Sequence, residues 1–129
     1  MRKTAFLLVM QFLWFCSFSQ FSLTGIYTQD FNSLSNSGTA TGLPSGWVML
    51  ETGTAADLFY TAGTGSGSTG DTYSFGNSAS TDRALGTLLS GTLQSTSGFY
   101  FSNATGNTIT RLTVTYAGEQ WRLGATGRN

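Results

Sequence analysis

Histidine is absent from this 129-residue chain, and cysteine and proline each occur only once. Without histidine, neither a Ser-His-Asp nor a Cys-His nucleophilic site can form. The same absence removes nearly all zinc sites, because these use histidine or cysteine ligands. The single cysteine, Cys16, lies near the N-terminus. A chain that loses its first twenty residues therefore has no disulfide and no thiol chemistry.

Basic residues are also scarce. After position 20 the chain has no lysine, and four arginines stand against six acidic residues, a net charge of −2. No Lys/Arg cluster is present, so binding to a phosphate backbone has no electrostatic basis. We therefore expect no nucleic-acid partner for this segment.

The first twenty residues have the layout of a secretory signal peptide. Arg2 and Lys3 precede an apolar run over residues 5–18, and small or polar residues follow at Ser19 and Gln20. The apolar run is shorter than the roughly 20 residues that a membrane-spanning helix needs. This order predicts a cleavable signal over residues 1–20, with cleavage near Ser19 or Gln20 and no membrane association afterwards. The predicted location is secreted or at the cell surface.

An alternative for this region is lipid attachment at Cys16. Lipid-attachment sites need small residues immediately before the cysteine, whereas Trp14 and Phe15 are bulky. The cleavable signal is therefore the preferred interpretation.

Residues 21–129 have a composition suited to short strands. Thr, Ser and Gly supply 51 of these 109 residues, which is enough chain for one domain with a modest core. Thirteen aromatic residues fall in short clusters between Gly-rich breaks, a pattern typical of strands joined by turns rather than of disorder. The predicted strands span residues 26–31, 46–51, 57–61, 72–75, 84–89 and 98–102. Residues 32–46, which include Pro44, and 62–70 are predicted as loops.

The clearest strand pattern covers residues 112–116. Leu112, Val114 and Tyr116 alternate with threonines, which predicts a half-buried strand. The dipeptide Gly106-Asn107 favours a turn, so we predict a hairpin with the preceding strand. A bulge at Gly118 would then place Trp121 on the same face as Tyr116.

No window after the signal shows helical periodicity, and many short strands favour a sandwich. The predicted fold is all-β, an antiparallel β-sandwich of jelly-roll type in residues 21–129. About seven strands are recognisable where such folds have about eight. We therefore expect the sandwich to be incomplete at the C-terminus, as in the N-terminal fragment of a longer protein.

Gly65, Gly67 and Gly70 match the G-x-G-x-x-G spacing of dinucleotide sites. Such a site needs the motif to open a helix, whereas an alternating strand pattern follows here. The stretch is therefore interpreted as a Gly/Ser loop.

The acidic residues show no catalytic or metal-binding spacing. They are Asp30, Glu51, Asp57, Asp71, Asp82 and Glu119. Glycosidases need two carboxylates on either side of one bond, and no local pattern pairs these. Calcium needs clustered oxygen ligands, to which Asp57 or Asp71 beside the 62–70 loop could contribute, although no D-x-D-x-D spacing exists. We assign no catalytic residue, no metal ligand and no cofactor, with calcium kept as the weaker alternative.

Two groups of side chains could either contact a ligand or stabilise the fold. The aromatic residues able to stack on sugar rings are Trp47, Tyr73, Tyr116 and Trp121. Aromatics on a sandwich more often fill its core, so the core interpretation is preferred. The charged residues are Arg83, Arg111, Glu119 and Arg122, for which we expect ion pairs at a sheet surface. The ligand-binding residues stay undetermined.

Four stretches occur together: YTQDFNSL at residues 27–34, LPSGW at 43–47, DRALG at 82–86 and GEQWR at 118–122. As a set they resemble the N-terminal jelly-roll-like β-sandwich module of large secreted bacterial proteins. Those proteins often carry nuclease, lamin-tail or adhesin domains further along, and a type IX sorting tail. The resemblance covers residues 27–124 and implies an extracellular setting with no catalytic residue in this module.

The sequence therefore favours a non-catalytic extracellular module that binds a glycan or a cell-surface component, or that acts as a scaffold. One alternative is an accessory N-terminal domain of a secreted hydrolase, such as a nuclease, whose active site lies beyond residue 129. Another is a structural spacer in an adhesin.

Overall fold

The structure is a computed structural model, and it describes residues 20–124. The predicted signal peptide lies outside the described residues, apart from Gln20, and so does Cys16. No helix in the described part of the chain is long and apolar enough to cross a membrane.

Eight short strands and no helix build the described chain, which confirms the all-β prediction. The strands are β1 (Phe21–Leu23), β2 (Thr39–Ala40), β3 (Trp47–Thr52), β4 (Tyr60–Gly63), β5 (Asp71–Phe75), β6 (Ala84–Leu88), β7 (Gln94–Phe99) and β8 (Phe101–Asn103).

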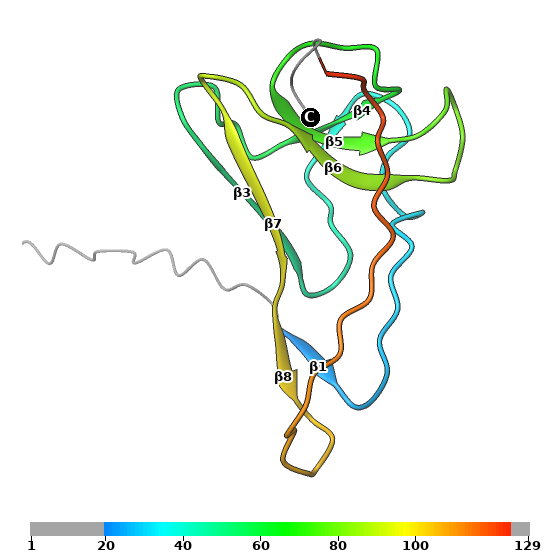
Figure 1. Cartoon of the computed structure of the whole chain (residues 1–129), viewed down its shortest axis with the longest axis vertical. Helices are drawn as coiled ribbons and strands as arrows, with labels where there is room; N and C mark the ends of the chain where they lie inside the picture. The colour runs from blue at the N-terminus through cyan, green and yellow to red at the C-terminus, as the bar shows by residue number, and fades with distance from the viewer. Residues whose placement is uncertain (1–19, 125–129) are drawn as a thin grey trace, which may run out of the picture.

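These strands form three small sheets (Figure 1). One sheet has the order β2-β4-β5-β6, the second pairs β3 with β7, and the third pairs β1 with β8. Figure 1 shows β1 and β8 at one end of the molecule, the four-stranded sheet at the other, and the β3-β7 ribbon between them. The predicted antiparallel pairing holds for β2-β4, β3-β7 and β5-β6, whereas β1-β8 and β4-β5 are parallel.

Several predicted strands are confirmed, with shifted ends. The runs at 46–51, 72–75 and 84–89 become β3, β5 and β6, and the run at 57–61 contributes only the start of β4. The run at 98–102 is divided at Tyr100 between β7 and β8. The 26–31 strand was wrong: the chain there is irregular, and residues 21–23 form the first strand instead.

The predicted strand over residues 112–116 is also wrong. This segment has no strand partner and its side chains are exposed, so no hairpin with β8 and no bulge at Gly118 forms. The strand that precedes it, β8, pairs in parallel with β1 through the register Phe21↔Phe101. Alternation makes a segment suited to a strand, but a strand forms only where a partner offers backbone hydrogen bonds.

Aromatic side chains hold the β1-β8 end to the β3-β7 ribbon. The Tyr27 ring stacks on Phe99 with a centroid distance of 4.3 Å, and Phe31 meets the Trp47 ring edge-on at 4.6 Å. The Trp47 indole N–H donates a 3.0 Å hydrogen bond to the Tyr27 hydroxyl. This cluster supplies apolar contact that the Gly/Ser/Thr-rich strands cannot.

The interior between the β3-β7 ribbon and β5 is polar to an unusual degree. Glu51, Thr72, Ser74 and Arg83 are all buried. The side chains of β5 alternate, so Thr72 and Ser74 face this interior while Tyr73 and Phe75 face the opposite side of the sheet. Two candidate sites adjoin β5: a cleft beside Tyr73 and Phe75, and a group of acidic residues at the start of the strand.

Candidate functional site

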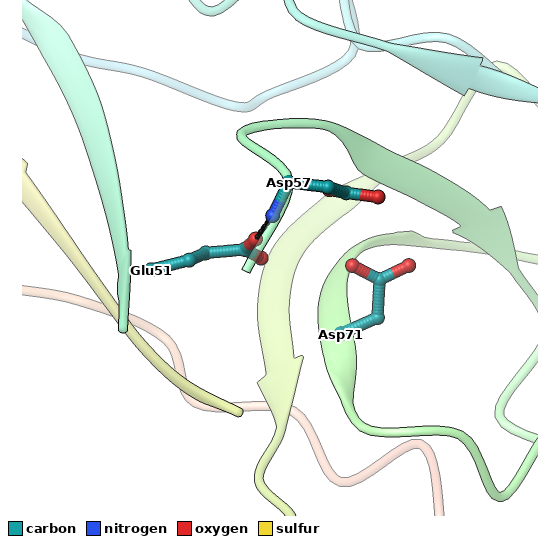
Figure 2. Close-up of side chains that lie close together, drawn as sticks. All are labelled: Glu51, Asp57 and Asp71. Atoms are coloured by element: carbon teal, nitrogen blue, oxygen red, sulfur yellow. Dashed lines mark hydrogen bonds between the residues drawn. The ribbon is translucent and has the colours of Figure 1, made fainter. Parts of the chain in front are cut away.

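A cluster of three carboxylates lies at the start of β5 (Figure 2). Glu51 comes from β3, Asp57 from the loop before β4, and Asp71 from the start of β5. One carboxylate oxygen of each lies within 4.8 Å of the others. The cluster unites residues up to twenty positions apart, which no local spacing in the sequence indicates.

Glu51 is the fixed member of the cluster because several donors point at its carboxylate. The Thr72 hydroxyl donates to Oε1 at 2.6 Å and the Thr72 amide donates to the same oxygen at 3.2 Å. The amide of Asp57 donates to Oε2, also at 3.2 Å. Burial alone would raise the pKa of Glu51, but these hydrogen bonds and one from the Leu58 amide outweigh it and hold the pKa below its usual value.

The pKa of Asp71 is shifted in the opposite direction, above its usual value. Burial raises its pKa most, and the negative charges of Glu51 and Asp57 raise it further. Hydrogen bonds from the Thr61 side chain and the Thr72 amide lower the pKa but do not reverse the shift. The cluster therefore contains one carboxyl whose pKa is lowered, Glu51, and one whose pKa is raised, Asp71.

The cluster offers oxygen ligands of the kind that calcium takes. The sequence singled out Asp57 and Asp71 for this chemistry but not Glu51, whose position in β3 gave no signal. Three carboxylates provide only part of the six to eight oxygens that calcium coordinates.

A cleft of about 810 Å³ lies on the side of the four-stranded sheet that Tyr73 and Phe75 face. Its floor comes from β4, β5 and β6, and its walls from the 64–67 loop, residues 77–79 and the chain at 116–122. In Figure 1 the chain after β8 runs back along the molecule and ends beside the four-stranded sheet. The cleft therefore exists only because the C-terminal part of the described chain returns to this sheet.

Stacked aromatic rings line the cleft. The Trp121 ring is almost parallel to Phe75, with an interplanar angle of 6° and a centroid distance of 6.1 Å, and Phe75 stacks on Tyr73 at 4.9 Å. Glycines on the neighbouring strands make room for these rings. A Cβ at Gly63 would lie 2.8 Å from the Tyr73 ring, and one at Gly86 would lie 2.8 Å from the Phe75 ring.

Hydrogen bonds position the rings and the wall. The Tyr73 hydroxyl donates to the Thr69 carbonyl oxygen at 2.8 Å, and the Trp121 indole donates to Glu119 at 2.7 Å. Burial first, and the Asp71 charge second, raise the pKa of Tyr73, although Arg122 opposes them. The Arg122 guanidinium donates to the carbonyl oxygens of Ser66 and Gly67, which fastens the returning chain to the Gly-rich loop.

The two tryptophans, Trp47 and Trp121, lie in different surroundings. Trp47 belongs to the packed aromatic cluster, as the core interpretation predicts. Trp121 instead lines the cleft, Tyr73 lies buried beneath it, and the Tyr116 side chain is 86% exposed. Of the two tryptophans, Trp121 lines this cleft and Trp47 does not.

The expected surface ion pairs do not form within residues 20–124. Arg83 is buried and donates to the Ser74 hydroxyl and carbonyl oxygens and to the Asn77 carbonyl oxygen, not to a carboxylate. Glu119 accepts from Trp121, and Arg122 binds the loop carbonyls. The sequence could not show this, because backbone carbonyls are acceptors that leave no trace in residue identity.

The Gly-rich stretch at 65–70 is a loop that leads directly into β5, as predicted. Since no helix follows, it has no helix N-terminus to hold a phosphate. Gly65 has φ +80°, and a Cβ there would lie 1.8 Å from the Trp121 carbonyl oxygen. The loop glycine therefore allows the close approach of the returning chain.

Comparisons with protein-family models, curated proteins and solved structures find no match to this chain.

Proposed function

We propose that the chain is a non-catalytic, extracellular binding module, and that it binds a glycan in the cleft beside β5. The observation that carries this proposal is the stacked pair Phe75 and Trp121 at the edge of an open cleft of about 810 Å³. Flat aromatic faces suit the apolar faces of sugar rings, and cavities of this volume suit ligands of a few rings.

The polar residues around these rings support the same ligand class. Hydroxyl and amide side chains at the rim include Thr64, Ser66, Asn77 and Gln120. Such neutral donors and acceptors match the hydroxyl groups of a sugar. Together with the aromatic floor they offer both stacking and hydrogen bonding in one site.

The charge of the cleft supports a binding rather than a hydrolytic role. Among the described residues that line it, Glu119 is the only acid, and its carboxylate accepts the indole N–H of Trp121. Glycoside hydrolysis requires two carboxylates across the scissile bond. The acidic cluster does not supply the second one, because Glu51, Asp57 and Asp71 are not among the described residues that line the cleft.

The predicted export signal and the resemblance to jelly-roll-like modules of secreted bacterial proteins support an extracellular location. Glycans are the abundant ligands of that compartment. Any hydrolase or adhesin activity of a longer parent protein would then belong to residues other than these.

The test is glycan retention with matched tryptophan and phenylalanine variants. The wild-type chain is titrated with neutral and acidic polysaccharides by affinity electrophoresis and calorimetry. We expect Trp121→Ala to abolish retention and Phe59→Ala to leave it unchanged, because Phe59 is 45% exposed but lies outside the cleft. Retention that survives Trp121→Ala, or a wild-type chain that retains no polysaccharide, would overturn the proposal.

A further inference from the structure

The chain from 108 to 120, which we call the return segment, has an unused pairing surface. All thirteen of its residues are exposed, and none is in a strand. Within residues 20–124 its backbone N–H and C=O groups form no backbone hydrogen bond. Figure 1 shows it as a long stretch of chain running beside the sheets after β8.

The side chains of this segment alternate in the manner of a strand. Leu112, Val114 and Tyr116, which would share one face of a strand, are 55%, 73% and 86% exposed. The segment has no proline, β-branched residues occupy several positions, and the only charges are Arg111 and Glu119. An exposed chain with these properties pairs readily with another strand.

We propose that the return segment pairs with the same segment of a second copy, antiparallel and centred on Thr115. In this register Thr115 faces its own counterpart and Val114 faces Tyr116 of the other copy. Arg111 then faces Glu119 of the other copy, and the reverse pair forms at the far end by symmetry. The two-fold symmetry therefore forms the Arg111–Glu119 pair twice, once at each end of the contact.

Each contact in this register has a physical basis. Aromatic and β-branched side chains opposite one another stabilise an antiparallel pair, as do opposite charges. Arg111 makes no ion pair or hydrogen bond within the described residues, so its guanidinium is available. The pairing also satisfies backbone groups that otherwise face solvent. A register shifted by two residues would break both charge pairs, which makes this one specific.

Cysteine cross-linking tests the register. In a Cys16→Ser background, Thr115→Cys should form a disulfide-linked dimer under mild oxidation, because facing residues have Cα atoms within disulfide range. Thr113→Cys is the matched control on the same face. Its counterpart lies about 13 Å away, four residues along the strand, so it should stay monomeric. Equal cross-linking at both positions would instead indicate a parallel or random contact and would overturn the proposal.

Charge exchange tests the pairing of Arg111 with Glu119. In sedimentation experiments we expect Arg111→Glu alone and Glu119→Arg alone to associate about tenfold more weakly than the wild type. A mixture of these two variants should form a dimer again, because each pairs its altered charge with the complementary one. The double variant Arg111→Glu with Glu119→Arg should also recover. A wild-type chain that is monomeric at every concentration, or variants that do not recover on mixing, would contradict the proposal.

The return segment and the cleft share residues, because Tyr116 and Glu119 line the cleft and Glu119 accepts the indole N–H of Trp121. Arg111→Glu should weaken association while the chain still retains its glycan, since Arg111 does not line the cleft. Arg111→Glu is therefore the variant that distinguishes a failure of the pairing proposal from a failure of glycan binding.

Discussion

The indole of Trp121 lies nearly parallel to the ring of Phe75, at an interplanar angle of 6° and a centroid distance of 6.1 Å. The two residues are 46 positions apart, and they meet because Arg122 holds the returning chain against the Gly-rich loop. Trp47, by contrast, packs against Phe31 and Phe99 in the aromatic cluster. The two tryptophans should therefore respond differently to truncation.

We expect Trp47→Ala to lower the free energy of unfolding by about 3 kcal/mol, the cost of removing a packed aromatic ring. Trp121→Ala should lower it by about 1 kcal/mol, which corresponds to one aromatic pair at a surface. Urea unfolding followed by circular dichroism measures both. Equal losses would mean that Trp121 is a core residue and not a ligand-contacting one.

Thr72→Val should destabilise the chain by about 2 kcal/mol. Its hydroxyl has one proton, which it donates to Glu51, so the Ser95 hydroxyl must donate the 2.6 Å bond to Thr72. Valine removes both bonds, so the buried Glu51 carboxylate keeps only backbone amide donors and the half-buried Ser95 hydroxyl loses its partner. The pKa of Glu51 should rise as well, because its main lowering hydrogen bond is lost. Carboxyl-carbon NMR titration measures that pKa.

The matched control for Thr72 is Thr96→Val on β7, where the side chain is exposed. This variant should change stability by no more than about 0.5 kcal/mol. A similar loss at both threonines would show that the effect comes from strand propensity instead of from the buried hydrogen bonds.

The pH dependence of stability should reveal the raised pKa of Asp71. Its folded-state pKa lies above 3.8, so the folded chain holds the proton more tightly than the unfolded chain. The contribution of Asp71 to stability therefore decreases as the pH rises from about 3.8 through its folded pKa. Glu51 acts in the opposite sense: its contribution is present above 4.5 and is lost as the pH falls through its lowered pKa.

Asp71→Asn separates these two effects. Asparagine can keep the hydrogen bond from the Thr72 amide while it removes the cost of burying the charge and the repulsion with Glu51 and Asp57. Relative to the wild type, we expect no gain below pH 3.8 and about 0.5 kcal/mol of stabilisation at neutral pH, since solvent screens a half-buried charge. Urea unfolding between pH 3 and 7 checks this. A variant less stable than the wild type at pH 7 would contradict the repulsion.

Gly86→Ala should disturb the aromatic floor of the cleft. The new Cβ would lie 2.8 Å from Cδ2 and 2.9 Å from Cε2 of Phe75, so the ring must move or the strand must shift. Overpacking of this kind costs about 2 kcal/mol. Gly98→Ala on β7 is the control, because nothing lies within 4 Å of its Cβ position and it should be nearly neutral. Thermal unfolding compares the two variants directly.

The sequence by itself determined that the chain is all-β, that it lacks histidine chemistry, and where β3, β5 and β6 lie. These conclusions depend on residue types and on local alternation, both of which are visible in a linear chain. The sequence also identified the 65–70 stretch as a loop, because a strand pattern follows the glycines there.

Only the tertiary structure decided which residues meet. Glu51 joins Asp57 and Asp71 because β3 lies against the start of β5, and Trp121 reaches Phe75 because the chain returns after β8. The strand predicted at residues 112–116 is a further case in which the local sequence did not show which segments meet. Alternation gives a segment the side chains of a strand, but pairing requires a neighbouring backbone, and the sequence of one segment does not specify where its neighbours lie.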